Sequence, residues 1–315
     1  MKQLNHLCII YHSIIGSISI ETNHNILPIN IEVALKGTEV NNNKCSKPEL
    51  LKNEYHLWYT NPQECQDPSL LEQYRQLLTE KETEKQQRYI FEKDRHDALI
   101  TRAFIRDLLS QYMDTPAEDW RFSKGDKGKP EIINPPIPLR FNISHTKGLI
   151  ICAVTLDHDI GCDVEQTERK SDVLAIADRF FSKIEVKELF SLPVSKQRDR
   201  FFDYWTLKES YIKALGEGLA IPLSEFSYHI GANQSEWQNN NIHLSFVPSR
   251  KDNPELWQSW LFYPGQEHRI SVSIRNRFAQ QKDAVKWPSY KARFFESVPL
   301  VGFSEVDRIS TSVVL

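Results

Sequence analysis

The chain has 315 residues, 40 % of them hydrophobic, and a formal net charge of −3. This length supports one large domain or two smaller ones with hydrophobic cores. A charge this small creates no overall field toward nucleic acid or an anionic membrane, so neither is an expected partner. No apolar run reaches the roughly 18–20 residues of a membrane-spanning helix.

The five cysteines are odd in number and show no C-x-x-C spacing, so they do not predict a disulfide framework. Cys152 and Cys162 fall in strand-like apolar runs and are expected to be small buried hydrophobes. The stretch LCIIYHSIIGSISI has one nearby cation, an internal histidine and no clear cleavage site, and so resembles a signal peptide only weakly. A reducing, cytoplasmic compartment is the simplest interpretation.

The N-terminal part differs in composition from the remainder. NNNKCSKPE, residues 41–49, is polar and rich in turn formers, which predicts a loosely attached extension over residues 1–52. A strand-like run follows at 55–60, and the periodicity of residues 70–112 predicts a largely helical segment. Glycine and proline make residues 120–138 loop-like, before RFNIS and GLIICAVTL predict two strands.

The second part repeats this plan. IGCDVE predicts a strand, residues 172–192 predict a helix, and FFDYWTLKESYIKALGEGL predicts a second helix that ends at Gly216 or Gly218. A loop, IPLSEFSYHI, is followed by strand candidates IHLSFVP, WQSWLFYP and HRISVSIR. Helices followed by strands, twice over similar lengths, predict an α+β fold of two similar halves, 53–158 and 159–276, with a C-terminal tail at 277–315. Each half is expected to pack helices on a small, mainly antiparallel sheet.

The aromatic-rich helix carries two charges in an unusual place. At about 100° per residue, Lys208 and Glu209 fall on its apolar arc. An i,i+4 pair of Glu209 with Lys213 on a solvated helix would add only about 0.2–0.5 kcal/mol. An ionised carboxylate in an apolar face costs several kcal/mol without compensation, so we expect a group across the core to meet Glu209. The arc is formed by Phe201, Phe202, Trp205, Ile212 and Leu215.

The strand IGCDVE contains the candidate groups that would lie opposite Glu209. Strand alternation puts Asp163 and Glu165 on one face, roughly 6–7 Å apart, although such a pair by itself is more typical of a solvent-facing strand. Three converging carboxylates repel each other and need a divalent cation or a raised pKa. Oxygen ligands without a histidine or cysteine cluster favour Mg²⁺, or Mn²⁺ in its place, over zinc. Because Mg²⁺ fills its remaining positions with water and substrate phosphates, the substrate is expected to be a phosphate ester or anhydride.

Cationic and donor groups suited to a polyphosphate lie nearby in the sequence. DKGKP supplies Lys127 and Lys129, and FNISHT places Ser144 and His145 at the end of a strand. Each has an ordinary alternative, namely a solvated loop lysine or a structural histidine. The mixed charges of the long helix are typical of a solvated face.

The order GKP, FNISH, GCDVE and FFDYWTLKESYIKALGEGL resembles that of the 4′-phosphopantetheinyl transferases of the surfactin-synthetase-activating type, over roughly residues 55–274. The resemblance implies an enzyme that transfers the 4′-phosphopantetheine arm of coenzyme A to a serine of an apo acyl or peptidyl carrier protein. The second product is 3′,5′-ADP, and the metal is Mg²⁺. It also implies a monomer of two pseudo-twofold halves with the active site in the cleft between them.

The resemblance also implies roles for individual residues. The metal ligands would be Asp163, Glu165 and Glu209. Lys213 would contact the pyrophosphate, and other coenzyme A contacts would come from Lys129, Ser144, His145 and, for the 3′-phosphate, Lys93 with Lys85 and Arg88 as alternatives. Cys162 stands where the family usually has Ile or Val, and by alternation its side chain points away from the metal.

The catalytic residues implied in this way are Glu209, Lys213 and His145. Glu209 would take the proton of the carrier serine, directly or through a water, while Lys213 and His145 would offset charge on the pyrophosphate. The stem of Lys208 is expected to lie along the apolar arc with its ammonium at the cleft edge, contacting substrate or an acid. An acidic carrier helix would dock on a basic or apolar patch, with candidates at Lys183, Lys187 and Lys196.

Two other functions fit the same residues. A magnesium-dependent phosphohydrolase would use the three carboxylates with water as nucleophile. A non-catalytic coenzyme A-binding protein would bind coenzyme A without requiring the metal.

Overall fold

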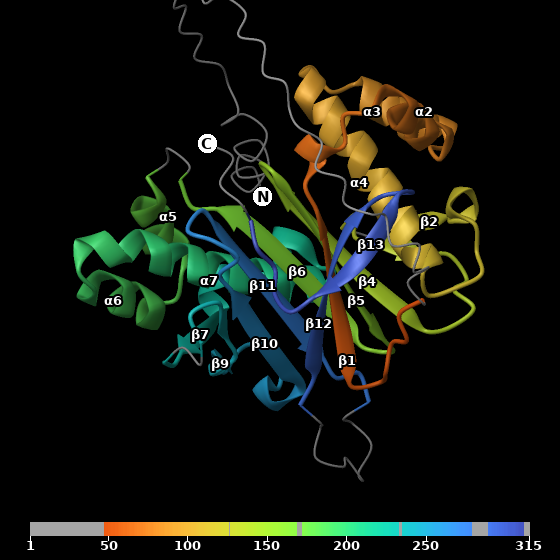
Figure 1. The fold of residues 1–315 in the computed structure, drawn as a ribbon. Helices are drawn as coiled ribbons and strands as arrows, with labels where there is room; N and C mark the ends of the chain where they lie inside the picture. The colour runs from red at the N-terminus through yellow and green to blue at the C-terminus, as the bar shows by residue number, and fades with distance from the viewer. Residues whose placement is uncertain (1–46, 126, 169–171, 233–234, 279–288, 312–315) are drawn as a thin grey trace, which may run out of the picture. The chain divides into compact units, whose positions relative to one another are not determined.

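Two β-sheets, each packed against a long helix, form the core of the protein in the computed structural model (Figure 1). The structure describes residues 47–125, 127–168, 172–232, 235–278 and 289–311, so nearly all of the predicted extension, with Cys8 and Cys45, lies outside it. Residues 45–315 form one compact unit. The fold is α+β, as predicted. Within the described ranges, no helix has both the length and the apolar character needed to cross a membrane.

The first sheet has the strand order β13-β12-β1-β5-β4, and only the β1–β12 pairing is parallel. Its strands are β1 (Glu54–Thr60), β4 (Leu139–Thr146), β5 (Leu149–Leu156), β12 (Lys291–Val298) and β13 (Gly302–Val306). A short hairpin of β2 (Phe122–Lys124) and β3 (Pro130–Ile132) interrupts the stretch predicted to be loop-like.

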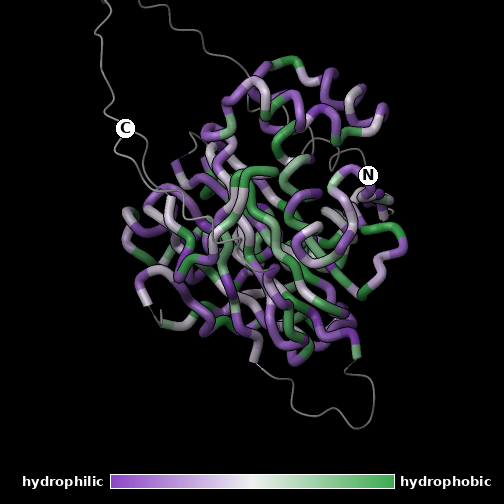
Figure 2. Tube along the Cα trace, turned by 45° about the vertical axis from the view of Figure 1, so that its right-hand side comes forward, coloured by the Kyte–Doolittle hydropathy of each residue, from purple (hydrophilic) through white to green (hydrophobic). Residues whose placement is uncertain are grey.

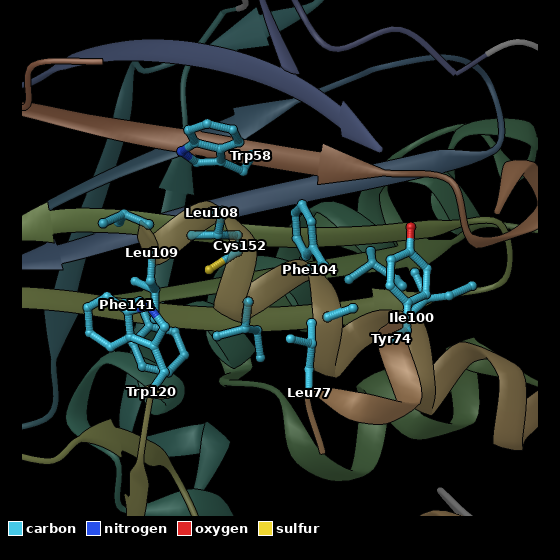
Figure 3. Close-up of a cluster of buried hydrophobic side chains, with 14 of the residues drawn as sticks. Trp58, Tyr74, Leu77, Ile100, Phe104, Leu108, Leu109, Trp120, Phe141 and Cys152 are labelled. Atoms are coloured by element: carbon cyan, nitrogen blue, oxygen red, sulfur yellow. The ribbon is translucent and has the colours of Figure 1, made fainter. Parts of the chain in front are cut away.

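The segment predicted to be largely helical, 70–112, contains three helices. They are α2 (Pro68–Gln76), α3 (Glu80–Gln87) and α4 (Glu92–Ser110). The Thr79 side chain accepts a hydrogen bond from the Glu82 backbone N–H, and Glu82 bonds back in a capping box, so a new helix begins there. Residues of α4, including Phe104 and Leu108, pack against Trp58 and Cys152 of the sheet (Figure 3).

The second sheet is antiparallel with the order β6-β11-β10-β8. Its strands are β6 (Asp159–Gln166), β8 (Gln238–Asn239), β10 (Trp257–Phe262) and β11 (His268–Arg275). The helices of this part are α5 (Val173–Phe180), α6 (Lys183–Ser191) and α7 (Val194–Leu215). The predicted helix over 172–192 is therefore two helices, because Ser182 caps α6 through Glu185. IPLSEFSYHI was predicted to be a loop, but β7 (Phe226–Ile230) lies within it and pairs with β9 (Ile242–Phe246).

The C-terminal strands complete the first sheet. β12 lies parallel to β1, with Leu57 opposite Phe294, and the rings of Trp58 and Phe295 stack at 4.6 Å. The Tyr74 hydroxyl of α2 donates to the Pro299 carbonyl in the β12–β13 turn. Apolar and hydrogen-bonded contacts thus attach this hairpin to both the sheet and its helices. The division of the chain into four segments remains a prediction.

Strand β6 and helix α7 approach each other unusually closely. Alternation along β6 directs Cys162 into an apolar core cluster with Ile160 and Val164, while Gly161 faces α7. A Cβ on Gly161 would lie 2.0 Å from the Ser210 carbonyl oxygen and 2.4 Å from the Ala214 nitrogen. Only glycine allows this approach without moving the helix. Cys152 and Cys162 are fully buried, as predicted.

Gly161→Ala should destabilise the protein by about 3 kcal/mol or more, because the added methyl group would meet helix backbone rather than a flexible side chain. Urea unfolding measures the change. Gly302→Ala is the matched control, since a Cβ there has no heavy atom within 4 Å. Equal stability of the two variants would contradict the close approach.

Candidate active site

A cavity of about 270 Å³ lies between the β2–β3 hairpin and the C-terminal half of α7. Helix α7 contributes Glu209, Ile212 and Lys213 to its lining, and β4 contributes Asn142 and Ile143. The remaining lining residues are Lys127, Gly128, Lys129, Pro130, Gly216 and Gly218. Residues from three parts of the sequence that the motifs singled out therefore share one cavity.

Lys129 connects the hairpin to the body of the protein. Its ammonium donates to the carbonyls of Ile160 in β6 (3.1 Å) and Ala214 in α7 (2.9 Å), and its burial lowers its pKa to about 8. Gly216 ends α7 with a φ of 74°, and a Cβ there would lie 3.2 Å from the Lys129 side chain. The ammonium is thus engaged by two carbonyls, and the predicted phosphate contact stays a prediction.

Asp163 is the centre of a buried polar cluster. Its Oδ1 accepts hydrogen bonds from Lys213 Nζ (2.6 Å) and Ser144 Oγ (2.9 Å), and Lys213 also donates to Ser144 Oγ (2.9 Å). Asp163 is fully buried, and its other oxygen, Oδ2, has no hydrogen-bond partner among the residues that the structure describes. The structure therefore brings together three predicted site residues, from β6, α7 and β4.

Glu209 lies close enough to this cluster to respond to its charge. Burial and the negative charge of Asp163 raise the pKa of Glu209 to about 7, and Lys213 partly opposes them. Burial would lower the pKa of Lys213, but the charges of Asp163 and Glu209 outweigh it, so this pKa is raised. The carboxylate of Glu209, a residue only 9 % exposed, accepts no hydrogen bond from the described residues. Asp163, across the core in β6, is close enough for its charge to act on Glu209, but it is another acid, and the compensating cation, Lys213, is on α7 itself.

Glu165 lies on the same face of β6 as Asp163 and is buried, with its Oε1 accepting from Trp205 Nε1 (2.9 Å). Among the described residues, no three acids, histidines or cysteines stand in the arrangement of a metal site. Asp163 is engaged by Lys213, and Glu165 by Trp205. Nevertheless, the unpartnered Asp163 Oδ2 and the Glu209 carboxylate offer oxygen ligands in a buried place, which fits an oxygen-liganded cation.

Asn142 is a site residue that the motif analysis missed. Its Oδ1 accepts from the backbone N–H of Cys162 (2.8 Å), and Ser144 Oγ accepts from that of Val164 (3.3 Å). Side chains of β4 thus take the place of a backbone ladder to β6 and fix Asp163 opposite Ser144. The available signal was the alternation in FNISH, which puts Asn142 and Ser144 on one face.

The remaining predicted residues lie toward α4. His145 is exposed at the end of β4, and desolvation, followed by the charge of Lys213, lowers its pKa against the opposing effect of Asp94. Lys93 is exposed on the first turn of α4.

The pKa of Lys85 is lowered by partial desolvation and by the positive charges of Lys124 and Arg102. Arg102 and Lys124 were not predicted from the sequence, because α3, α4 and β2 meet only in the folded chain.

The Lys208 ammonium was predicted to lie at the cleft edge, but the structure shows that it does not. It is fully buried and pairs with Glu185 of α6 (2.8 Å). Its other two donors reach the carbonyls of Leu223 and Phe226 (both 2.7 Å). Glu185 also accepts from the Tyr228 backbone N–H (2.9 Å), so both charges are compensated. The reason is rotation along the helix: adjacent side chains on α7 point about 100° apart, so Lys208 faces α6 while Glu209 faces β6.

Comparison with known proteins agrees with this geometry. A family model of the 4′-phosphopantetheinyl transferase superfamily matches residues 159–273, and a model of the N-terminal region of 4′-phosphopantetheinyl transferases matches residues 62–156. The 4′-phosphopantetheinyl transferase Sfp of Bacillus subtilis is 37 % identical over 160 residues, which cover 50 % of this chain and 69 % of Sfp.

Two further relatives are similar. The transferase HetI of Nostoc is 35 % identical over 54 % of this chain and 72 % of its own length. The transferase gsp of Aneurinibacillus migulanus is 38 % identical over 49 % of this chain and 62 % of its own. The chain thus spans about two thirds of these relatives. It belongs to the 4′-phosphopantetheinyl transferase superfamily.

Lys208→Met should cost about 3–5 kcal/mol of stability, because it leaves the Glu185 carboxylate buried without a cation. Adding Glu185→Gln removes that charge and keeps a hydrogen-bonding side chain at the cap, so the double variant should recover much of the loss. Urea unfolding of the four proteins in this double-mutant cycle measures the coupling. Additive losses would show that the two side chains do not act as a pair.

Relative to Glu209→Gln, the protein, kept free of divalent cations by a chelator, should lose stability as pH rises from about 4.5 to about 7. In this window folded Glu209, with its raised pKa, still holds a proton that the unfolded chain has released. The contribution is up to about 3 kcal/mol, and Glu209→Gln should remove it. Urea unfolding at pH 5 and pH 7.5 tests this, with exposed Glu118→Gln as control. The same pH dependence in all three proteins would refute the raised pKa.

Proposed function

We propose that this protein transfers the 4′-phosphopantetheine arm of coenzyme A to the serine hydroxyl of an apo acyl or peptidyl carrier protein, with 3′,5′-ADP as the second product. The observation that carries the proposal is the convergence of Asp163, Glu209 and Lys213 beside one cavity, in a member of this family. A cation, a proton-holding carboxylate and oxygen ligands are together what a diphosphate-cleaving transfer needs.

Asp163, Glu209 and Glu165 would hold Mg²⁺, or Mn²⁺ in its place. The support is the buried, unpartnered Asp163 Oδ2 beside a Glu209 carboxylate that accepts no hydrogen bond from the described residues. When bound, the ion supplies Lewis-acid stabilisation of charge on the pyrophosphate.

Lys213 exchanges partners when the diphosphate enters. Its ammonium now neutralises Asp163, with Nζ 2.6 Å from Oδ1, and it turns to a phosphate oxygen of coenzyme A. His145 donates one ring N–H to the same phosphate group. Both groups stabilise charge that develops as the bond to 3′,5′-ADP breaks.

Glu209 is the proton acceptor. It would take the serine proton directly or through a water, and a bound cation would lower its pKa from the value of about 7 that it has in the metal-free protein. The serine oxygen forms a bond to the β-phosphorus, the bond from that phosphorus to the departing 3′,5′-ADP breaks, and the serine proton passes to Glu209. No other reactant is required.

Coenzyme A itself would be held by cations of the first half, among which Lys129 lines the cavity. Lys85, whose pKa the charges of Lys124 and Arg102 lower, and Lys93 are the candidates for a phosphate monoester such as the 3′-phosphate. The two α+β halves with a pseudo-twofold relation, the cleft between them, a monomeric state and a cytoplasmic setting are parts of the same proposal. Each sheet with its long helix supports the two-half division.

Incubation of the protein with coenzyme A, MgCl₂ and an apo carrier protein should increase the carrier's mass by one phosphopantetheine group. Glu209→Gln should lower kcat by about 10²–10³ while coenzyme A still binds, since one charged group of the transition state is lost. Intact-protein mass spectrometry and calorimetry give the two readouts, and Glu118→Gln is the control.

Other outcomes of this experiment assign other functions. Release of phosphopantetheine without any carrier would identify a hydrolase. Coenzyme A binding that survives Asp163→Ala, with no turnover in the native protein, would identify a binding protein. A Glu209→Gln variant with full turnover would exclude Glu209 as the base.

A further inference from the structure

A second cavity, of about 400 Å³, lies beside strand β3 and the start of strand β4 and is termed the hairpin cavity. Among the described residues, it shares only Lys129 and Pro130 with the cavity of the candidate active site. Strand β4 passes from one cavity to the other, because Phe141 lines the hairpin cavity and Asn142 lines the active-site cavity. The proposed transfer reaction uses none of the other residues that line the hairpin cavity.

The lining of the hairpin cavity is largely apolar. A cavity of this volume, apolar with a few polar groups, is typical of sites that bind small molecules. Phe278 is 53 % exposed there, and Ile133 and Ile137, in the loop between β3 and β4, are 48 % and 36 % exposed. Apolar groups gathered at a surface typically mark a binding site. Besides Pro130, the apolar lining residues are Ile132, Pro135, Pro138, Leu139, Phe141 and Phe278.

Figure 2 shows hydrophobic segments, in green, at the periphery of the tube as well as at its centre, so exposed apolar segments are not confined to the core strands.

Two arginines of the hairpin cavity differ in how firmly they are engaged. Arg140 Nη2 lies 2.9 Å from Asp159 Oδ1 and 3.9 Å from Glu131 Oε1. Arg277 Nε lies 3.7 Å from the same Asp159 oxygen, which is too long for a hydrogen bond. The Arg277 guanidinium donates no hydrogen bond to any described residue. Its planar set of donors is therefore available to a ligand in the cavity.

Arg277 and Phe278 are held beside the cavity by contacts outside it. The Arg277 backbone N–H donates to His158 Nδ1 (3.3 Å), and the Phe278 ring meets the His158 ring edge-on, with the centroids 5.4 Å apart. The Phe278 backbone N–H donates to Asn276 Oδ1 (2.9 Å). The guanidinium and the aromatic ring are thus positioned before any ligand binds, which reduces the entropy that binding costs.

The charges around Arg277 select one class of anion. A guanidinium matches a carboxylate or a phosphate through two parallel hydrogen bonds. Glu131 and Asp157 line the same cavity, and Asp159 lies between the two arginines. These three acids repel a second negative charge on a ligand, so a carboxylate is favoured over a phosphate dianion. The apolar lining requires an apolar body, and an aromatic ring can pack against Phe278.

We infer that the hairpin cavity is a second ligand site, which binds a small organic monocarboxylate with an aromatic or similarly apolar body. The carboxylate pairs with Arg277, and the body lies against Phe141, Phe278 and the prolines of the β3–β4 loop. Since the two cavities have separate walls apart from Lys129 and Pro130, this ligand binds without displacing coenzyme A. The inference does not depend on transferase activity.

A matched series of small molecules tests the inference on the native protein by ligand-detected NMR. The probe 3-phenylpropanoate should bind with a Kd on the order of 0.1–1 mM, as expected for a ligand of about ten heavy atoms. The neutral 3-phenylpropanamide, the ring-free propanoate and the dianionic 2-phenylethyl phosphate should each bind at least about 10-fold more weakly. Saturating coenzyme A should leave the Kd of the probe unchanged.

Substitutions test the two residues that carry the inference. Arg277→Gln and Phe278→Ala should each weaken binding of 3-phenylpropanoate at least about 10-fold, with thermal unfolding as the check that each variant is folded. Arg75→Gln and Phe190→Ala, which change an arginine and a phenylalanine exposed elsewhere, are the matched controls and should keep the native Kd. Hydrogen exchange of the native protein should show protection of residues 130–141 and 277–278 when the probe is added.

Several results would overturn the inference. They are the absence of probe binding to the native protein, equal binding of the amide and the carboxylate, native affinity in Arg277→Gln, or protection at other residues. Displacement of the probe by coenzyme A would assign the hairpin cavity to the coenzyme A site. Tighter binding of the phosphate ester than of the carboxylate would contradict the ligand class.

Discussion

The candidate site depends on the direct contact between strand β6 and helix α7. Gly161 allows the helix backbone to lie against the strand, with no room for a Cβ between them. Two residues further along β6, Asp163 accepts a hydrogen bond from Lys213, and its negative charge raises the pKa of Glu209. A larger residue at position 161 would separate these groups, and the low-dielectric contact that raises the pKa of Glu209 would weaken.

Charges buried on two different faces of α7 have different environments. On the α6 side, Lys208 has three acceptors and Glu185 has donors for both oxygens, so that pair is fully satisfied and holds the helix in one orientation. On the β6 side, Asp163 keeps an unpartnered oxygen and Glu209 accepts no hydrogen bond from the described residues. Satisfied polar networks stabilise a structure, whereas incompletely satisfied groups in a cavity are typical of a binding or catalytic site.

Side chains, rather than backbone ladders, join the parts around the cavity. Asn142 and Ser144 satisfy N–H groups of β6, and Lys129 satisfies carbonyls of β6 and α7. The same three residue types that suit anion binding thus also hold the walls of the cavity together. This explains why motifs recognised for their chemistry also have structural partners in the folded chain.

Local pattern was sufficient to predict the α+β class, the strands around the motifs, the aromatic-rich helix and the shared face of Asp163 and Glu165, because each follows from periods of 2 or 3.6 residues. It failed where capping divided the helix predicted over 172–192, at Ser182, since side-chain hydrogen bonds there outweigh helical periodicity. Only the tertiary structure decided which groups meet: Lys208 with Glu185, and Lys129 with Ala214. These partners are far apart along the chain, and their contacts depend on how elements pack, which no local pattern records.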